Sequence, residues 1–162
     1  MKKIKYSDFF SFSKKILIKS KFDNKSARIL AECLCQTSLR GVDSHGIRLL
    51  NHYVQSTIAG KKNAKPKYKI YKKFPSVSLL DADEALGHLS GFKAIEMGIK
   101  DCRKYGLSMV VVKNSKHPGA LSSIAIPAAK KGYAVLAFTN SDSLMLSFNG
   151  KKALLGTNPI CF

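Results

Sequence analysis

The chain has 162 residues and is 45% hydrophobic, which suffices for one packed domain, and no apolar run approaches the roughly 18 residues of a membrane-spanning helix. Its formal net charge is +18, yet only four of its 28 basic residues are arginine, and the scattered lysines accompany no finger or RNA-stacking motif. This composition favours a solvated lysine-rich surface over specific nucleic-acid binding, and an N-terminus without a cleavage site favours the cytoplasm.

Two helices are predicted at the start of the chain. The first covers residues 7–22, with Ser7 as its N-cap, and its apolar side chains at helical spacing are Phe9, Phe12 and Ile16. The second begins at residue 23 or 24 and ends at Gly41, and its apolar stripe consists of Ala27, Leu30 and Leu34. Both predictions rest on helical periodicity between a polar cap and a terminating residue.

A third helix is predicted from residue 43 or 44 to residue 60. On a helical wheel its core-facing stripe consists of Ile47, Leu50, Val54, Thr57 and Ile58. His45, Arg48 and His52 fall on the opposite arc. His45 lies in the first turn, where the helix dipole favours a neutral imidazole and attracts an anion such as a carboxylate, and Arg48 is suited to bind that carboxylate. An ordinary amphipathic surface helix shows the same polar arc, so both interpretations stand at this point.

Strands and helices alternate in the second half of the chain. A charged connector over residues 61–74 passes into an edge strand, and residues 76–83 are predicted to pair with it. Two further helices are predicted over 91–106 and 120–132, the latter kinked or shortened by Pro127. Two continuous apolar runs predict strands buried on both faces, at 107–113 and 133–140. Asn149 and Gly150 then predict a hairpin turn.

This order of elements predicts an α/β (α+β) fold with an all-helical N-terminal segment. We expect a helical segment over residues 1–62 and a partial α/β sheet domain over residues 63–162. The four cysteines are predicted to be free thiols, because no spacing of cysteine or histidine indicates a disulfide or a metal site.

Three polar turns follow apolar runs in this second half. The first contains His117 and Gly119, the second spans residues 139–142, and the third spans residues 156–159. Because open α/β sheets bind ligands at the carboxyl ends of their strands, the three turns are predicted to converge on one cleft. Each turn by itself is more often a plain connection. The conventional G-x-G-x-x-G dinucleotide fingerprint is absent, so a standard Rossmann domain is not supported.

The ordered motifs RGVDSHGIRLLNHYV, KHPGA, AFTNSD and GTNPICF resemble the malate/L-lactate dehydrogenase-like family, which includes ureidoglycolate, sulfolactate and diketogulonate dehydrogenases. The resemblance extends over essentially the whole chain. It implies hydride transfer between a 2-hydroxy acid and its 2-keto acid with NAD or NADP as the cofactor. It also implies a non-Rossmann nucleotide-binding fold and a homodimer.

The resemblance also implies roles for individual residues. His45 and His117 would be the candidate acid/base residues. Arg48 would meet the substrate carboxylate, and the substrate pocket would be lined by Thr157 and Asn158. The residues implied to lie near the cofactor are Gly119, Ala120 and Ser141. No metal and no specific nucleic acid or membrane partner is implied.

This chain departs from the family pattern at several points. Pro118 stands where an aromatic residue often follows the second histidine, and Leu49 stands where many members have the helix arginine, which puts the role of Arg48 in doubt. Members run to roughly twice this length. The alternatives to a dehydrogenase are therefore an inactive truncated fragment or a lysine-rich binding module without catalysis.

Overall fold

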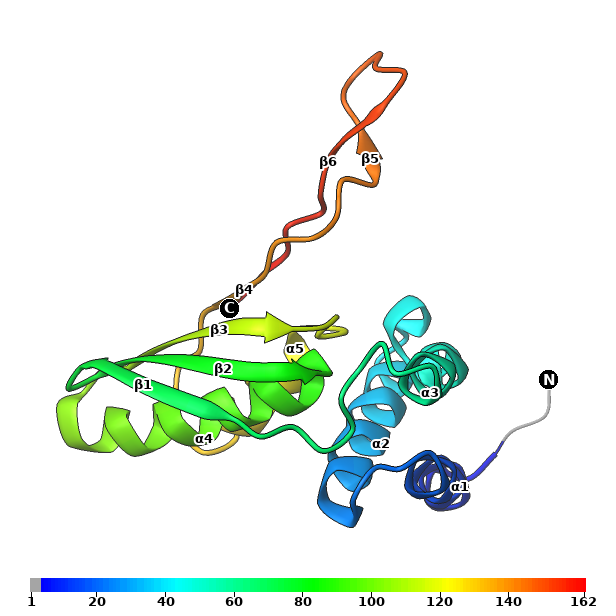
Figure 1. Ribbon diagram of the computed structural model, residues 1–162, viewed down its shortest axis with the longest axis horizontal. Helices are drawn as coiled ribbons and strands as arrows, with labels where there is room; N and C mark the ends of the chain where they lie inside the picture. Colours follow the sequence, from blue (N-terminus) through cyan, green and yellow to red (C-terminus); the bar gives the residue numbers. More distant parts are fainter. Residues whose placement is uncertain (1–3) are drawn as a thin grey trace.

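The computed structural model describes residues 4–162 (Figure 1). The first half contains α1 (Tyr6–Lys19), α2 (Asn24–Leu39), the 3-10 turns η1 (Asp43–His45) and η2 (Ile47–Leu49), and α3 (Leu50–Ile58). The sheet part follows, with β1 (Lys69–Phe74), β2 (Val77–Ala85), α4 (Gly87–Tyr105), β3 (Met109–Ser115) and α5 (Ser122–Ala129). The last strands are β4 (Ala137–Phe138), β5 (Met145–Leu146), β6 (Ala153–Leu155) and β7 (Ile160–Cys161).

Helix α2 is the centre of the helical part. The Asp23 side chain caps it by accepting a hydrogen bond from the Ser26 N–H at 2.9 Å, which decides between the two predicted starting residues, 23 and 24. The predicted stripe is confirmed, because its three side chains are fully buried: Ala27, Leu30 and Leu34. The same core cluster includes Leu86 and Leu89 from the beginning of α4, so one core joins the helices to the sheet part.

Helix α1 differs from its prediction at its cap and on its apolar face. Ser7 is inside the helix, and Lys5 precedes it without a side-chain cap, so the predicted Ser7 cap is wrong. Phe12 is 58% exposed, whereas Leu17 is fully buried. The stripe was predicted one position away from the face that α2 covers, because consecutive apolar residues here leave the periodicity ambiguous.

A three-stranded sheet in the order β1-β2-β3 forms the second part. β1 and β2 pair antiparallel, as predicted, and β2 and β3 pair parallel through the crossover helix α4. Figure 1 shows α4 and α5 on one side of the sheet only. β3 is an edge strand because it is last in this order. With helices on one side of the sheet, the other face of β3 is open, and Met109 is 56% exposed. The predicted burial of residues 107–113 on both faces is therefore wrong.

Helix α4 begins at Gly87, four residues before the predicted start. A Cβ on Gly87 would lie 2.4 Å from the Pro118 Cα, so only glycine allows the loop after β3 to pass this close. The Gly87 N–H donates a hydrogen bond to the His117 carbonyl at 3.2 Å. This contact fixes the start of α4 against the carboxyl end of β3. Helix α5 is shorter than predicted and contains Pro127.

Residues after α5 form a narrow arm that extends away from the rest of the molecule (Figure 1, orange and red). β4 pairs only with β7 and β5 only with β6, both antiparallel. Asn149 and Gly150 lie in the turn between β5 and β6, which confirms the predicted hairpin. The predicted buried strand over 133–140 is wrong, because its regular part is two residues long and Phe138 is 62% exposed.

Among residues 4–162, no helix combines the length and apolar character that crossing a bilayer requires. All four cysteines are free thiols in the structure; Cys33 and Cys35 are buried within α2, whereas Cys102 and Cys161 are partly exposed.

Candidate active site

The segment predicted as one helix over residues 43–60 is broken in two places. Residues 43–49 form two 3-10 turns that meet at Gly46, and the α-helix begins only at Leu50. A Cβ on Gly46 would lie 2.2 Å from the Ser38 Oγ, and the same hydroxyl accepts a hydrogen bond from the Ile47 N–H at 2.9 Å. This close approach to α2 bends the chain, since Ser38 replaces a helical hydrogen-bond partner.

This break corrects two parts of the prediction. His45 is not in the first turn of an α-helix, so the dipole argument for its neutral state does not apply to it. The predicted stripe is also partly wrong: Leu50, Val54 and Thr57 are buried, but Ile58 is 54% exposed. The side chain that replaces it in the core is Tyr53, which is fully buried.

The break brings together the two histidines that the sequence singled out. The ring centroids of His45 and His117 lie 5.5 Å apart with an angle of 36° between the planes. His117 follows β3 directly, at the carboxyl end of a parallel strand pair, as predicted. The packing of α2 against α4 and α5 joins the helical part to the sheet part and brings these distant residues together, at the edge where α/β sheets bind ligands.

The Nδ1 atom of each of these histidines is hydrogen-bonded to the hydroxyl group of another residue. The Tyr53 Oη lies 2.8 Å from His117 Nδ1, and the Ser44 Oγ lies 2.9 Å from His45 Nδ1. A hydrogen bond at Nδ1 orients an imidazole and leaves its Nε2 free for proton transfer. Tyr53 is a rigid, buried partner, whereas Ser44 is exposed, so the ring of His117 is held the more firmly of the two.

His88 is a third histidine of this cluster, and sequence reasoning missed it. It lies in the first turn of α4 and is 1% exposed, with its ring edge-on to Tyr53 at 5.4 Å between centroids. Its Nδ1 is buried without a hydrogen-bond partner among the described residues. The available signal was a histidine directly after a glycine at the beginning of a helical pattern. The missed signal for Tyr53 was its position three residues after Leu50 on the apolar face.

Burial and neighbouring positive charge lower the pKa values of two histidines in this cluster, His88 and His117. Complete burial, reinforced by the charges of His117, His45 and Lys62, lowers the pKa of His88 to about 3. Burial also raises the pKa of the Tyr53 phenol, which therefore stays protonated. His117 is exposed to solvent as a residue, but its ring lies beside those of Tyr53 and His45. This partial burial, followed by the charges of His45, Lys62 and His52, lowers the pKa of His117.

Two other predicted site residues lie close to the histidines. Gly119 has a φ of +67°, and a Cβ there would lie 2.2 Å from the Nε2 of His88, so glycine is required for this loop to pack on that ring. Ala120 precedes α5, and its carbonyl accepts hydrogen bonds from the Ser123 hydroxyl and N–H. Both residues belong to the loop that carries His117.

The other predicted site residues do not join this cluster. Arg48 is exposed on η2, and no hydrogen bond or ion pair joins it to another described residue. The second and third polar turns meet each other in the arm: the Ser141 Oγ lies 3.1 Å from the Thr157 Oγ1, and the Ser141 N–H donates to the Asn158 Oδ1 at 3.0 Å. The predicted convergence of three turns is therefore wrong for this chain, because two of them meet away from the third.

A sequence profile described as malate/L-lactate dehydrogenase matches residues 4–162 of this chain. The chain belongs to this family. The matched residues include both the histidine cluster and the arm, so both segments belong to the family's sequence pattern. Among the described residues, no three histidine, cysteine or acidic side chains are grouped to hold a metal ion.

Several named relatives in the family are dehydrogenases. Malate dehydrogenase of Pyrococcus abyssi is 38% identical over 158 residues, which cover 98% of this chain and 44% of the relative. L-sulfolactate dehydrogenase of Methanocaldococcus jannaschii is 33% identical over 145 residues, which cover 90% of this chain and 42% of the relative. The chain therefore spans less than half the length of these relatives.

Solved structures of the family share the fold described above. Malate dehydrogenase from Pyrococcus horikoshii OT3 superimposes with a TM-score of 0.93 at 35% identity, over 98% of this chain and 46% of that one. Malate dehydrogenase from Entamoeba histolytica gives a TM-score of 0.91 at 31% identity, over 98% of this chain and 44% of that one. In both structures the matched region, which includes the arm, is less than half of the chain.

Proposed function

We propose that this chain carries the acid/base half of an NAD(P)-dependent oxidoreductase that interconverts a 2-hydroxy acid and its 2-keto acid. The observation that carries this proposal is the Tyr53–His117 hydrogen bond of 2.8 Å, with His45 beside it. A neutral imidazole with one nitrogen held and the other free is the group such a reaction requires near pH 7. The malate and sulfolactate dehydrogenases among its relatives support the substrate class.

Tyr53 suits both directions of the reaction. A phenol both donates and accepts hydrogen bonds, so its hydroxyl pairs with either neutral tautomer of His117. When His117 Nδ1 carries the proton and donates to Tyr53, Nε2 accepts the proton from the hydroxyl of a 2-hydroxy acid. In the reverse direction the imidazolium, whose Nδ1–H still donates to the Tyr53 oxygen, gives its Nε2 proton to the oxygen of a 2-keto acid and returns to the neutral imidazole. We therefore assign the acid/base role to His117.

His45 and Arg48 would bind the substrate. His45 lies next to His117 with its Nε2 free, and a hydrogen bond from this nitrogen to the reacting oxygen would hold the substrate against His117. Arg48 comes three residues later, is exposed and has no carboxylate partner among the described residues, which leaves its guanidinium available to a substrate carboxylate. Thr157 and Asn158 remain proposed pocket residues. Because they lie in the arm, the arm would have to take another position for them to reach the histidines.

The loop after β3 fits a nicotinamide nucleotide better than the arm does. Gly119 brings the backbone of this loop against the ring of His88, whose Nδ1 has no hydrogen-bond partner among the described residues. When bound, the nicotinamide ring would exchange the hydride with C2 of the substrate. Gly119 and Ala120 would lie against it. Ser141 is hydrogen-bonded within the arm, so its proposed place near the cofactor requires the arm to lie on another part of the protein.

The organisation of the complete enzyme is also a proposal. We propose a helical segment over residues 1–62 and a partial nucleotide- and substrate-binding domain over 63–162, acting in a homodimer. The arm supports this, because it exposes apolar side chains such as Leu144 at 78% and Phe148 at 95%, and a second chain or chain half would cover them.

A direct test is reduction of a panel of 2-keto acids by NADH and by NADPH, followed by absorbance at the nicotinamide band. The proposal expects turnover of at least one dicarboxylic or short-chain 2-keto acid, and loss of it in His117→Gln. Turnover that survives this substitution would refute the assigned role of His117. No turnover, with the chain alone or with the complementary half of a relative, would favour the inactive-fragment alternative.

A further inference from the structure

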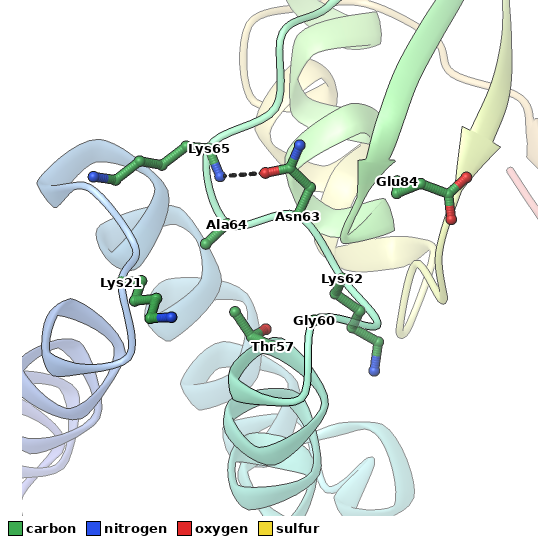
Figure 2. A pocket seen from close by; sticks show the side chains of 8 residues that line it. All are labelled: Lys21, Thr57, Gly60, Lys62, Asn63, Ala64, Lys65 and Glu84. Carbon is green, nitrogen blue, oxygen red and sulfur yellow. Dashed lines mark hydrogen bonds between the residues drawn. The ribbon is translucent and has the colours of Figure 1, made fainter.

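Lys62 connects the histidine cluster to a cleft between the helices and the sheet part. The cleft has a volume of about 480 Å³ and is lined by Lys21, Thr57, Gly60, Lys62, Asn63, Ala64, Lys65 and Glu84. Figure 2 shows that the side chains of Lys62 and Lys65 point away from each other, although they lie three residues apart. The loop is fixed where it passes β2, because the Asn63 N–H donates to the Glu84 carbonyl at 3.0 Å.

The ammonium group of Lys62 is held by residues of α3. It donates hydrogen bonds to the Ser56 Oγ at 2.6 Å and to the His52 Nε2 at 3.2 Å. It also lies over the ring of Tyr53, with 5.1 Å between the Nζ atom and the ring centroid. A lysine that only covered surface would keep its ammonium group in water. Here three partners converge on it, and none of them is an acid.

This arrangement concentrates positive charge beside the proposed acid/base. The titratable groups that face His117 are His45 from η1, His52 and Tyr53 from α3, Lys62 from the loop, and His88 from α4. Next to His117 in the chain, Lys116 is paired with Glu84. Burial and then the charges of Lys116 and Lys61 lower the pKa of Lys62 itself, so the neighbourhood is short of negative charge. A positive charge near an imidazole opposes its protonation.

We propose that Lys62 is a positioning residue of this site: its ammonium group, seated over Tyr53, orients the phenol toward His117 and opposes a positive charge on that imidazole. This inference rests on the proposed function for its catalytic meaning, but its electrostatic content concerns only residues of this chain. Its chemistry is that of a cation–π contact that holds the tyrosine ring from one side while the hydroxyl pairs with His117.

The test compares Lys62→Met with Lys62→Arg, which keeps the charge, and with Lys65→Met, which removes an exposed lysine of the same cleft. NMR titration of ring-labelled histidine gives the pKa of His117, with its signal assigned by its loss in His117→Gln. Lys62→Met should raise this pKa, because a nearby positive charge is removed, whereas Lys62→Arg and Lys65→Met should leave it near its original value. Thermal unfolding of each variant checks that the comparison is between folded proteins, and Lys62→Gln replaces Lys62→Met if the latter does not fold.

The pH profile of kcat/KM is the second measurement. For oxidation of a 2-hydroxy acid, in which unprotonated His117 accepts the proton, the acidic limb should move to higher pH in Lys62→Met, with activity on that limb falling roughly threefold for each half pH unit of displacement. For reduction of a 2-keto acid, in which the protonated imidazole donates, the basic limb should move to higher pH instead. An unchanged pKa of His117 in Lys62→Met would overturn the inference, whatever the activity. A raised pKa without any keto-acid turnover in the parent protein would uphold the electrostatic role and count against the proposed function instead. If the pKa of His117 were raised in Lys62→Arg as much as in Lys62→Met, the charge of Lys62 would not be the cause, and the charge-based role would be overturned.

Discussion

Tyr53 and His117 are 64 residues apart in the sequence, and their side chains form a 2.8 Å hydrogen bond between the phenolic oxygen and Nδ1. Tyr53 lies in α3 with its side chain in the hydrophobic core, and His117 lies in the loop that follows the parallel strand β3. The bond thus joins the helical part to the sheet part at the point where the proposed chemistry occurs.

Loss of the Tyr53 hydroxyl should therefore impair catalysis more than folding. In Tyr53→Phe we expect kcat to fall by roughly 10-fold, because His117 loses the partner that selects its tautomer. The ring remains to fill the core, so the cost in stability should be about 1–2 kcal/mol. Steady-state kinetics and urea unfolding separate the two effects. An unchanged kcat would show that this hydrogen bond does not orient the acid/base.

The two neighbouring histidines should respond differently to substitution. His117→Gln should lower kcat by about 100-fold or more, since it removes the group that transfers the proton. His45→Gln should act mainly on KM, because its proposed role is a hydrogen bond to the substrate. Both variants are compared with Gln55→Ala, at an exposed position of α3. If His45→Gln lost as much kcat as His117→Gln, the division of roles would be wrong.

Arg48 should act through the substrate carboxylate. Arg48→Gln is expected to raise KM for keto acids by roughly 10–100-fold, which corresponds to the loss of one charge-assisted hydrogen bond of about 1.5–3 kcal/mol. The affinity for the nucleotide should not change. Arg28→Gln, at an exposed position of α2, is the matched control. A normal KM in Arg48→Gln would assign the carboxylate to another residue.

Buried His88 should make the protein sensitive to acid. Its pKa is about 3 in the folded state, against 6.5 for an ordinary histidine. Between these values the unfolded chain binds one proton that the folded chain does not, so the free energy of unfolding falls as the pH falls through 6.5. From this group alone we expect a loss of about 2 kcal/mol between pH 7.5 and pH 5.

Chemical denaturation at a series of pH values measures this dependence. The slope should be shallower in His88→Gln, whose side chain does not titrate, than in His52→Gln, where the substituted histidine is exposed. Equal slopes in the two variants would mean that His88 is not the group responsible.

The arm should make the chain associate with itself. Phe148 is 95% exposed and Leu144 is 78% exposed, on a hairpin that pairs with no other part of the described chain. Exposed apolar hairpins are templates for association. Sedimentation velocity should show oligomers or aggregates at micromolar concentration. Phe148→Ser should reduce them without lowering the unfolding temperature of the helical core. A monodisperse monomer would contradict this expectation.

Local sequence signals determined most of the elements. Periodicity and the cap at Asp23 predicted α2 with its buried stripe, and alternating polar and apolar segments predicted the β1–β2 pair and the α4 crossover. The ordered motifs around His45 and His117 indicated the family, which the profile match confirmed. These signals are local, since caps, periodicity and motifs are properties of a few neighbouring residues.

What only the tertiary structure decided is how distant segments meet. The packing of Ser38 on Gly46 breaks the predicted third helix, and this contact between residues of two elements has no periodic signal. Tertiary packing also brings Tyr53, His88 and Lys62 around His117, and no sequence pattern had marked any of these three. The sequence likewise predicted buried strands in the arm from their apolar residues. Burial, however, depends on which surfaces come to cover a strand. Within residues 4–162 the strands of the arm pair only with each other, and their apolar side chains such as Phe138 remain exposed.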